Sequence, residues 1–200
     1  MKEIININTN DRLGPFRASV FSSGCEVWVY DNSYLEKIHE SGFWVDEIDE
    51  EKMKPIVKDG LLVAYELFQD DSIEVDVYVG EQLNKDELNF EFWFEPQEAF
   101  IRIPSGKLCI ETNDTCRLCI ENFEDFDPSD IDNEDRGAII DVPSGDYILT
   151  LYRQKYDKIY KSGLEYKGPE DIIILTKSER AKPFENPDPF IKYDWSDFNK

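Results

Sequence analysis

The sequence predicts a mainly β protein, an antiparallel β-sandwich built of hairpins and meanders with one or two short helices around residues 34–58. Three observations predict this class. Apolar and polar residues alternate over 73–79, the period-2 pattern of a half-buried strand. Short β segments are separated by clusters of turn residues. The turn Pro-Ser-Gly occurs twice, at 104–106 and at 143–145, each time between apolar-rich segments.

The first elements along the chain are short. Residues 3–8 alternate as a strand does, and residues 16–21 and 25–30 flank the small residues 22–24, which predicts a hairpin. Residues 34–40 are typical of a helical turn or two. The strongest helix prediction covers 46–58, where acidic residues would lie near the positive N-terminal end, although a proline at position 55 makes its second half doubtful.

The middle of the chain returns to β patterning. Residues 61–68 and 73–79 are predicted strands joined by the polar turn 69–72. Residues 88–94 repeat the alternation with Phe90, Phe92 and Phe94 on one side, which predicts a further strand.

The two Pro-Ser-Gly segments resemble each other. Residues 101–112 read IRIPSGKLCIET and residues 140–152 read IDVPSGDYILTLY, so each is predicted to be a strand, a turn and a return strand. Two interpretations stay open: two hairpins that use the same favourable turn, or a repeated unit.

The remaining segments differ sharply in composition. Residues 121–137 hold eight acidic residues and one basic residue, which predicts a solvated loop. The apolar run in 171–176 predicts a strand buried on both faces. Residues 181–200 combine three prolines with five aromatic residues and are expected to form an irregular tail packed on the body; the alternative is a partner-binding peptide.

We expect these elements to form two related β-rich halves that pack as one unit. The N-terminal half, 1–85, would contain the short helix, the C-terminal half, 86–180, would be a β-sandwich half with the two Pro-Ser-Gly hairpins, and 181–200 would be the tail.

Composition excludes several classes of function. The 200 residues include 44 Asp and Glu against 22 Lys and Arg, a formal net charge of -22, which disfavours binding to nucleic acid or to anionic lipid. An aromatic content of 14% argues against disorder in the body of the chain. The sequence has no apolar run long enough to span a membrane and its first residues do not form a secretory signal, so we expect a cytoplasmic protein.

Four cysteines raise the possibility of a metal or redox site. Cys116 and Cys119 form a CxxC, and zinc would need Cys109 and Cys25 as further ligands. However, Cys109 and Cys119 lie in apolar strand contexts, and residues three apart on a strand point to opposite faces. Buried structural thiols are therefore the preferred interpretation, and we expect no metal and no cofactor.

Other chemical motifs are weak. Residues 130–135 resemble the opening of a calcium loop, but Asp135 stands where an EF-hand needs glycine, so only a looser calcium site stays open. With one histidine, His39, and no nucleophile or phosphate-binding motif, we expect no enzymatic activity. Trp28, Trp93 and Trp195 are alternatives for stacking on sugar rings, although core packing is preferred for them.

The Pro-Ser-Gly segments carry a resemblance to a known family. Residues 101–108 (IRIPSGKL), an acidic spacer and residues 140–147 (IDVPSGDY) resemble the competence protein J family, over about residues 88–155. That family comprises small bacterial inhibitors of a DNA-entry nuclease with two Pro-x-Gly hairpins, the second followed by a tyrosine. The resemblance implies inhibition of a nuclease by direct binding, but it assigns no contact residue.

These observations favour a non-enzymatic acidic protein that binds and inhibits a basic protein, most concretely a nuclease or toxin. An acidic surface steers toward basic partners, and its carboxylates would occupy positions where substrate phosphates would lie. The alternatives are a carbohydrate- or calcium-binding β-sandwich, with or without hydrolase activity, and a subunit of a larger assembly. The predicted partner-binding residues lie in the acidic loop: Glu124, Asp125, Asp127, Asp130, Asp132, Glu134 and Asp135.

Overall fold

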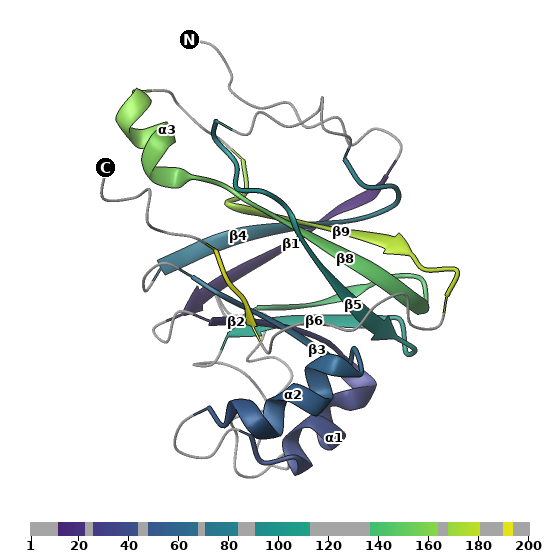
Figure 1. The fold of residues 1–200 in the computed structure, drawn as a ribbon. Helices are drawn as coiled ribbons and strands as arrows, with labels where there is room; N and C mark the ends of the chain where they lie inside the picture. Colours follow the sequence, from purple (N-terminus) through teal and green to yellow (C-terminus); the bar gives the residue numbers. More distant parts are fainter. Residues whose placement is uncertain are drawn as a thin grey trace.

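A computed structural model of the chain confirms a mainly β sandwich with short helices inside the predicted region 34–58 (Figure 1). The structure describes residues 12–22, 26–43, 48–67, 71–83, 91–112, 137–163, 168–180 and 190–193.

Two five-stranded sheets face each other. Neighbouring strands are antiparallel except for the parallel pairs β4–β9 and β10–β3. Sheet A has the order β1 (Leu13–Ser22), β4 (Asp71–Val79), β9 (Asp171–Lys177), β8 (Gly145–Arg153) and β5 (Gln97–Ile103). Sheet B has the order β10 (Phe190–Ile191), β3 (Leu62–Glu66), β2 (Glu26–Asp31), β6 (Lys107–Thr112) and β7 (Ala138–Asp141).

The central core lies between the sheets and follows the period-2 pattern. On β4, Ile73, Val75 and Val77 point inward and are buried, whereas Glu74 points outward and is exposed. The predicted strand over 171–176 is β9, whose Ile173 and Leu175 join this core while Ile172 and Ile174 are buried on the outer face of sheet A. Both faces of β9 are therefore buried, as its unbroken apolar run predicts.

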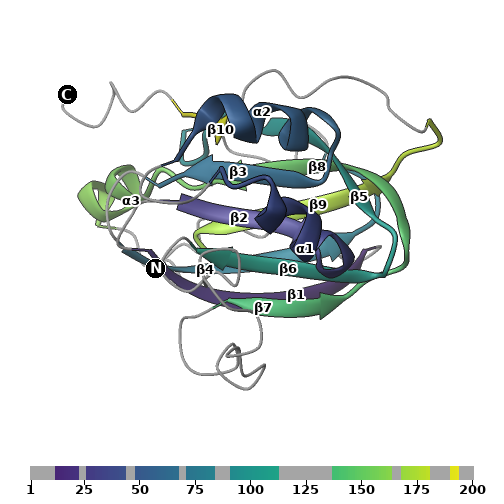
Figure 2. The same ribbon diagram turned by 90° about the horizontal axis from the view of Figure 1, so that it is seen from below.

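Helices cover the outer face of sheet B. The 3-10 turn η1 (Asn32–Tyr34), α1 (Leu35–Glu40) and α2 (Glu50–Lys58) lie against β2 and β3, and they bury Trp28 and Met53 in a second apolar cluster (Figure 2). Helix α2 begins after Asp49, whose side chain accepts hydrogen bonds from the N–H groups of Glu51 and Lys52. It continues past Pro55, which lies on the exposed face of the helix, where the carbonyl left without an N–H donor can be hydrated.

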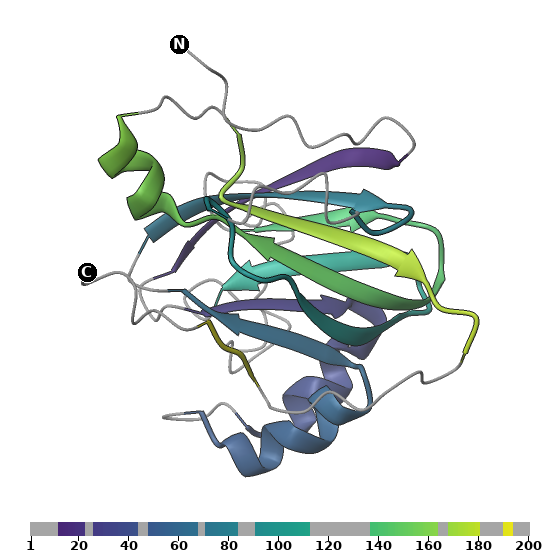
Figure 3. The same ribbon diagram turned by 45° about the horizontal axis from the view of Figure 1, so that its top comes forward.

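Aromatic residues and Ile159 of α3 (Tyr156–Ser162) cover part of the outer face of sheet A. Figure 3 shows α3 beyond the end of β8. Of the strand predicted at 88–94, the described residues 91–94 form a turn and an isolated bridge between Trp93 and Gln154, so the prediction of a regular strand is wrong there. Phe92 and Trp93 join the outer cluster, whereas Phe94 joins the central core. Strict alternation would place Phe92 and Phe94 on one face, and the irregular backbone instead buries all three aromatic side chains.

The predicted hairpins are wrong in one respect: the turns join strands of different sheets. Both Pro-Ser-Gly turns, β5 to β6 and β7 to β8, cross between sheets A and B, and so do the connections β1 to β2 and β3 to β4. The strands that these connections join pair in the same way in both halves of the chain. β1 pairs with β4 and β2 with β3, and likewise β5 pairs with β8 and β6 with β7. The four strands β1 to β4 and the four strands β5 to β8 are therefore arranged alike, with the first and last strand of each set in sheet A and the middle two in sheet B. An origin by duplication stays a prediction.

A buried carboxylate holds the first Pro-Ser-Gly crossing. Asp31, at the end of β2, accepts hydrogen bonds from the N–H of Ser105 (3.0 Å), the hydroxyl of Ser105 (2.8 Å) and the N–H of Ser33 (2.8 Å). At the second crossing, the Tyr147 hydroxyl donates to the Pro143 carbonyl. Gly106 is required between them, because its φ is +74° and a Cβ there would lie 2.8 Å from the Val142 carbonyl oxygen.

We expect Asp31→Ala to lower the free energy of unfolding by about 1.5–3 kcal/mol, since it removes the buried, charged acceptor of the hydrogen bonds from Ser33 and Ser105. Urea unfolding followed by fluorescence measures the change. The matched control is Asp141→Ala, which removes an exposed carboxylate paired with Lys107 and should cost less than about 1 kcal/mol. Equal effects of the two substitutions would contradict the assigned role of Asp31.

Candidate functional site

Carboxylates gather at one end of the sandwich, which we call the acidic end. Here β1, β3, β6 and β8 end and β2, β4, β7 and β9 begin, on the left in Figure 1. The opposite end holds both Pro-Ser-Gly crossings. The carboxylates of the described residues at the acidic end belong to Glu26, Glu66, Glu74, Glu111, Glu170 and Asp171.

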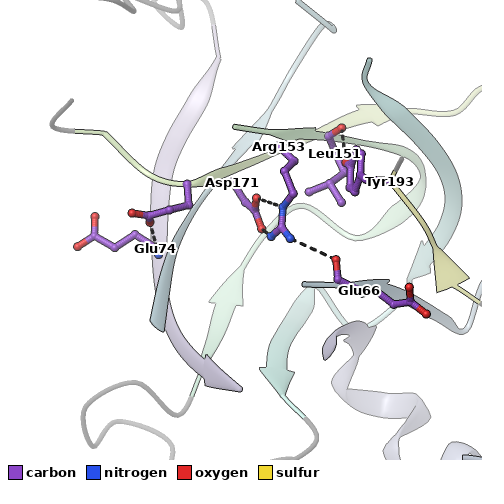
Figure 4. A network of polar contacts seen from close by, with 7 residues as sticks. Glu66, Glu74, Leu151, Arg153, Asp171 and Tyr193 are labelled. Atoms are coloured by element: carbon purple, nitrogen blue, oxygen red, sulfur yellow. Dashed lines mark hydrogen bonds and ion pairs between the residues drawn. The ribbon is translucent and has the colours of Figure 1, made fainter. Parts of the chain in front are cut away.

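A buried ion pair ties the two sheets together at this end. Arg153 and Asp171 are direct cross-strand neighbours on β8 and β9, and their side chains are 6% and 0% exposed. The Arg153 guanidinium donates to both Asp171 oxygens, through Nε over 2.7 Å and through Nη2. Its Nη1 donates over 3.2 Å to the main-chain carbonyl of Glu66 in sheet B (Figure 4). One guanidinium therefore links β8, β9 and β3.

Two tyrosines enclose this guanidinium. The ring centroids of Tyr65 and Tyr193 lie 5.2 and 5.9 Å from its central carbon, a cation–π arrangement. Tyr193 also packs against Phe94, with ring centroids 5.1 Å apart, and its hydroxyl donates over 3.4 Å to the Leu151 carbonyl. Residues 190–193 thus lie against the body, through β10 on β3 and through the buried Tyr193.

The pKa shifts keep this cluster in one protonation state. Burial lowers the pKa of Arg153, but the charge and hydrogen bonds of Asp171 outweigh burial and raise the pKa overall. Burial raises the pKa of Tyr65 and of Tyr193 above the ordinary tyrosine value. The guanidinium therefore stays charged and the phenols stay neutral across the physiological range, so the cluster serves structure rather than proton transfer.

Glu26 titrates near neutral pH. It lies opposite Glu66 on the neighbouring strand, and Glu66 forms an ion pair with Lys192 at 3.2 Å. Burial raises the pKa of Glu26 to about 7; the charge of Glu66 acts in the same direction, whereas hydrogen bonding with Trp28 and the charge of Lys192 oppose it. Burial thus brings the pKa of Glu26 into the physiological range, where the charge of this carboxyl changes.

Two further carboxylates are held by specific contacts. Glu170 accepts a hydrogen bond from the Glu74 N–H over 2.7 Å, and burial raises the pKa of Glu170. Glu111 is fully buried and accepts from the Tyr30 hydroxyl over 2.8 Å. The acidic end therefore holds buried and partly exposed carboxylates in defined positions, at the end of the sandwich where the described chain stops at Thr112 and resumes at Gly137.

The seven predicted partner-binding residues lie outside the described residues, and the structure places only the two ends of their segment. At the first end, the Thr112 hydroxyl donates to the Phe21 carbonyl over 2.7 Å. At the second, the Gly137 N–H donates to the Ser19 carbonyl over 3.0 Å. Thr112 and Gly137, the described residues on either side of 113–136, therefore both lie beside the last residues of β1. The residues concerned are Glu124, Asp125, Asp127, Asp130, Asp132, Glu134 and Asp135.

The other candidate sites were the tryptophans, the cysteines and the calcium-like segment, and the structure describes only some of these residues. Trp28 and Trp93 are fully buried, so they are core residues and the idea that they stack on sugar rings is wrong; Trp195 lies outside the described residues. Cys109 is buried, and its thiol lies 3.8 Å from the side-chain oxygen of Asn32. The other cysteines and the calcium-like segment 130–135 also lie outside the described part.

The described residues lack two kinds of feature. They contain no group of three or more His, Cys, Asp or Glu side chains that could hold a metal ion. Within the same ranges, no helix is both long enough and apolar enough to cross a membrane.

The Arg153–Asp171 pair was not predicted from the sequence, although a signal for it is present there. Arg153 is in phase with the inward-facing Leu149 and Leu151, and Asp171 is in phase with Ile173 and Leu175. A charged residue that continues the inward phase of a strand has to be paired if the strand end is buried. Recognising the two as partners required knowing that β8 and β9 are neighbours.

Comparisons with known proteins support the fold. No family model matches the sequence, and no curated protein matches it. Among solved structures, the chain is similar to one titled "Crocagin biosynthetic gene J", with a TM-score of 0.55 and 17% identity over 84% of this chain and 100% of that chain. It also matches ComJ from Bacillus subtilis, described as an inhibitor of the DNA degrading activity of NucA, with a TM-score of 0.44 and 10% identity over 84% of this chain and 97% of that one.

We expect Asp171→Asn to destabilise the protein by about 3–5 kcal/mol, because it leaves the buried Arg153 without its counter-charge. The control is Glu74→Gln, which removes a half-exposed partner of Arg17 and should cost less than about 1 kcal/mol. Chemical denaturation gives both values. If Asp171→Asn is no worse than the control, the ion pair does not hold this end of the sandwich.

We expect stability to fall as the pH rises from about 4.5 to about 7 through Glu26. Its folded pKa, about 7, lies above the ordinary value of 4.5, so the folded state holds a proton that the unfolded state releases in this window. Glu26→Gln should remove this contribution and be more stable than wild type at pH 8. Melting temperatures of both proteins across the window measure it, and parallel curves would contradict the shift.

Proposed function

We propose that this is a non-enzymatic protein that binds a basic protein partner through its acidic end. The observation that carries the proposal is the concentration of negative charge. Residues 121–137, called the acidic segment below, hold eight acidic residues and one basic residue. Thr112 and Gly137, the described residues between which these acidic residues lie, are held at the end of the sandwich where Glu26, Glu66, Glu74 and Glu170 also lie. Such a field attracts a basic surface and repels nucleic acid.

The charge exceeds what solubility needs. A small domain stays soluble with a net charge of magnitude about 2–8, whereas this chain carries -22. Exposed charge increases the association rate and selects the partner more than it adds affinity. Affinity requires apolar contacts as well, and Phe21 and Ile139, both about two-fifths exposed, lie on β1 and β7 beside the ends of the acidic segment.

We further propose that the partner is a nuclease or a related toxin and that binding inhibits it. This specific form comes from the resemblance of the two Pro-Ser-Gly segments to the competence protein J family. The mechanism would be occlusion, in which carboxylates of the acidic segment occupy the partner's phosphate-binding positions. The residues proposed for this role are Glu124, Asp125, Asp127, Asp130, Asp132, Glu134 and Asp135.

The test is affinity purification from lysate of the source organism, eluted with a salt gradient and analysed by mass spectrometry. We expect the wild type to retain one dominant basic protein that elutes at high salt. A variant with Glu124→Gln, Asp125→Asn, Asp127→Asn and Asp130→Asn should release it at lower salt, because it loses four of the charges that attract the partner.

The matched control neutralises four exposed carboxylates away from the acidic segment: Glu36, Glu40, Glu50 and Glu179, each changed to Gln. It changes the net charge equally, so it should elute like the wild type if position matters. Identical elution of both variants would remove the acidic segment from the interface, and inhibition assays on the recovered protein test the specific form.

A further inference from the structure

The outer edge of β7 is open within the described structure. β7 is the last strand of sheet B and pairs only with β6, in a register that places Ile139 opposite Cys109 and Asp141 opposite Lys107. The Val142 N–H donates to the Gly106 carbonyl over 2.9 Å. In this register Val142 lies opposite Gly106, so these two residues form a hydrogen-bonded pair of the ladder. Hydrogen-bonded and non-bonded pairs alternate along an antiparallel ladder.

This alternation sets the direction of each backbone group on β7. The N–H and C=O of Ile140 face β6, whereas those of Ile139 and Asp141 point away from the sheet. The neighbouring outward group, the Gly137 N–H, is taken by the Ser19 carbonyl of β1. No hydrogen bond joins the outward backbone groups of Ile139 or Asp141 to another described residue.

Side chains beside this edge have the character of an interface. Ile139 is 40% exposed and is one of the three large apolar side chains that stand out as exposed among the described residues. The Asp141 side chain is 78% exposed and forms an ion pair with Lys107. The acidic segment is covalently continuous with the start of β7 through Gly137.

We propose that the outer edge of β7 is a docking strand to which an extended, lysine- and arginine-rich segment of the basic partner adds as a further strand of sheet B. Main-chain hydrogen bonds to Ile139 and Asp141 would supply register, Ile139 would pack against an apolar side chain, and acidic groups would pair with basic ones. A second copy of this chain fits poorly, because it would bring two charges of -22 together. The inference rests on the proposed function and specifies how that surface binds.

Ile139→Pro is the decisive variant. Proline removes an N–H that no described group uses and suits an edge strand, so the fold should survive while strand addition is blocked. Ile139→Thr is the matched control, because it keeps the N–H and the β-branched shape. Circular dichroism and melting temperature verify folding of both.

The probe is a short synthetic peptide of alternating lysine and valine, with a second version N-methylated on alternate residues. We expect the unmodified peptide to slow amide hydrogen exchange at Ile139 and Asp141 but not at Ile140, whose N–H already faces β6. Ile139→Pro should weaken its binding by about tenfold or more, and Ile139→Thr by much less. The N-methylated peptide should bind the wild type about tenfold or more weakly than the unmodified peptide does. This comparison uses the wild type alone, so it still tests the proposal if Ile139→Pro fails to fold.

Unchanged exchange at Ile139 and Asp141 under saturating peptide, or equal binding by Ile139→Pro and wild type, would overturn the strand addition. The four-residue variant of the acidic segment separates this inference from the proposed function. If that variant loses the peptide while Ile139→Pro retains it, acidic recognition stands and docking on β7 does not. If both variants retain the recovered basic protein unchanged in the salt gradient, the proposed interface fails as a whole.

Discussion

The buried Arg153–Asp171 pair is the constraint on which the acidic end depends. It joins neighbouring strands of sheet A, reaches the Glu66 carbonyl of sheet B and is enclosed by Tyr65 and Tyr193. A guanidinium with a bidentate carboxylate, a carbonyl and two aromatic rings around it can remain charged inside the sandwich. The sheets are thereby joined by a cation at the end where carboxylates of β2, β3, β4 and β6 would otherwise repel one another.

A set of hydrogen bonds to a buried carboxylate organises the opposite end, where the two Pro-Ser-Gly crossings lie. Asp31 accepts from Ser33 and Ser105, and this fixes the first crossing between sheets beside the second one. A buried carboxylate at one end and a buried ion pair at the other therefore hold the register of strands whose apolar faces alone would tolerate sliding. This register is what leaves Ile139 and Asp141 directed outward on β7.

The fold class and the helices between residues 34 and 58 followed from local patterns, whereas α3 and the connectivity did not. Alternation in β4 and the long apolar run of β9 identify strands because each pattern reflects burial of one or two faces. A Pro-Ser-Gly turn reverses the chain equally well within a sheet or between sheets, so the turns at 104–106 and 143–145 could not distinguish a hairpin from a crossing. Likewise, composition identified the acidic segment, but the open edge beside it depends on the pairing of β6 with β7, which is a long-range property.

Binding of a basic protein at the acidic end can be located by zero-length carbodiimide cross-linking of the complex, followed by mass spectrometry. We expect links from lysines of the partner to carboxylates between residues 124 and 141, with few to the exposed Glu36, Glu40 and Glu50 of helices α1 and α2. Links confined to those helices, with none to the acidic segment or to Asp141, would contradict it.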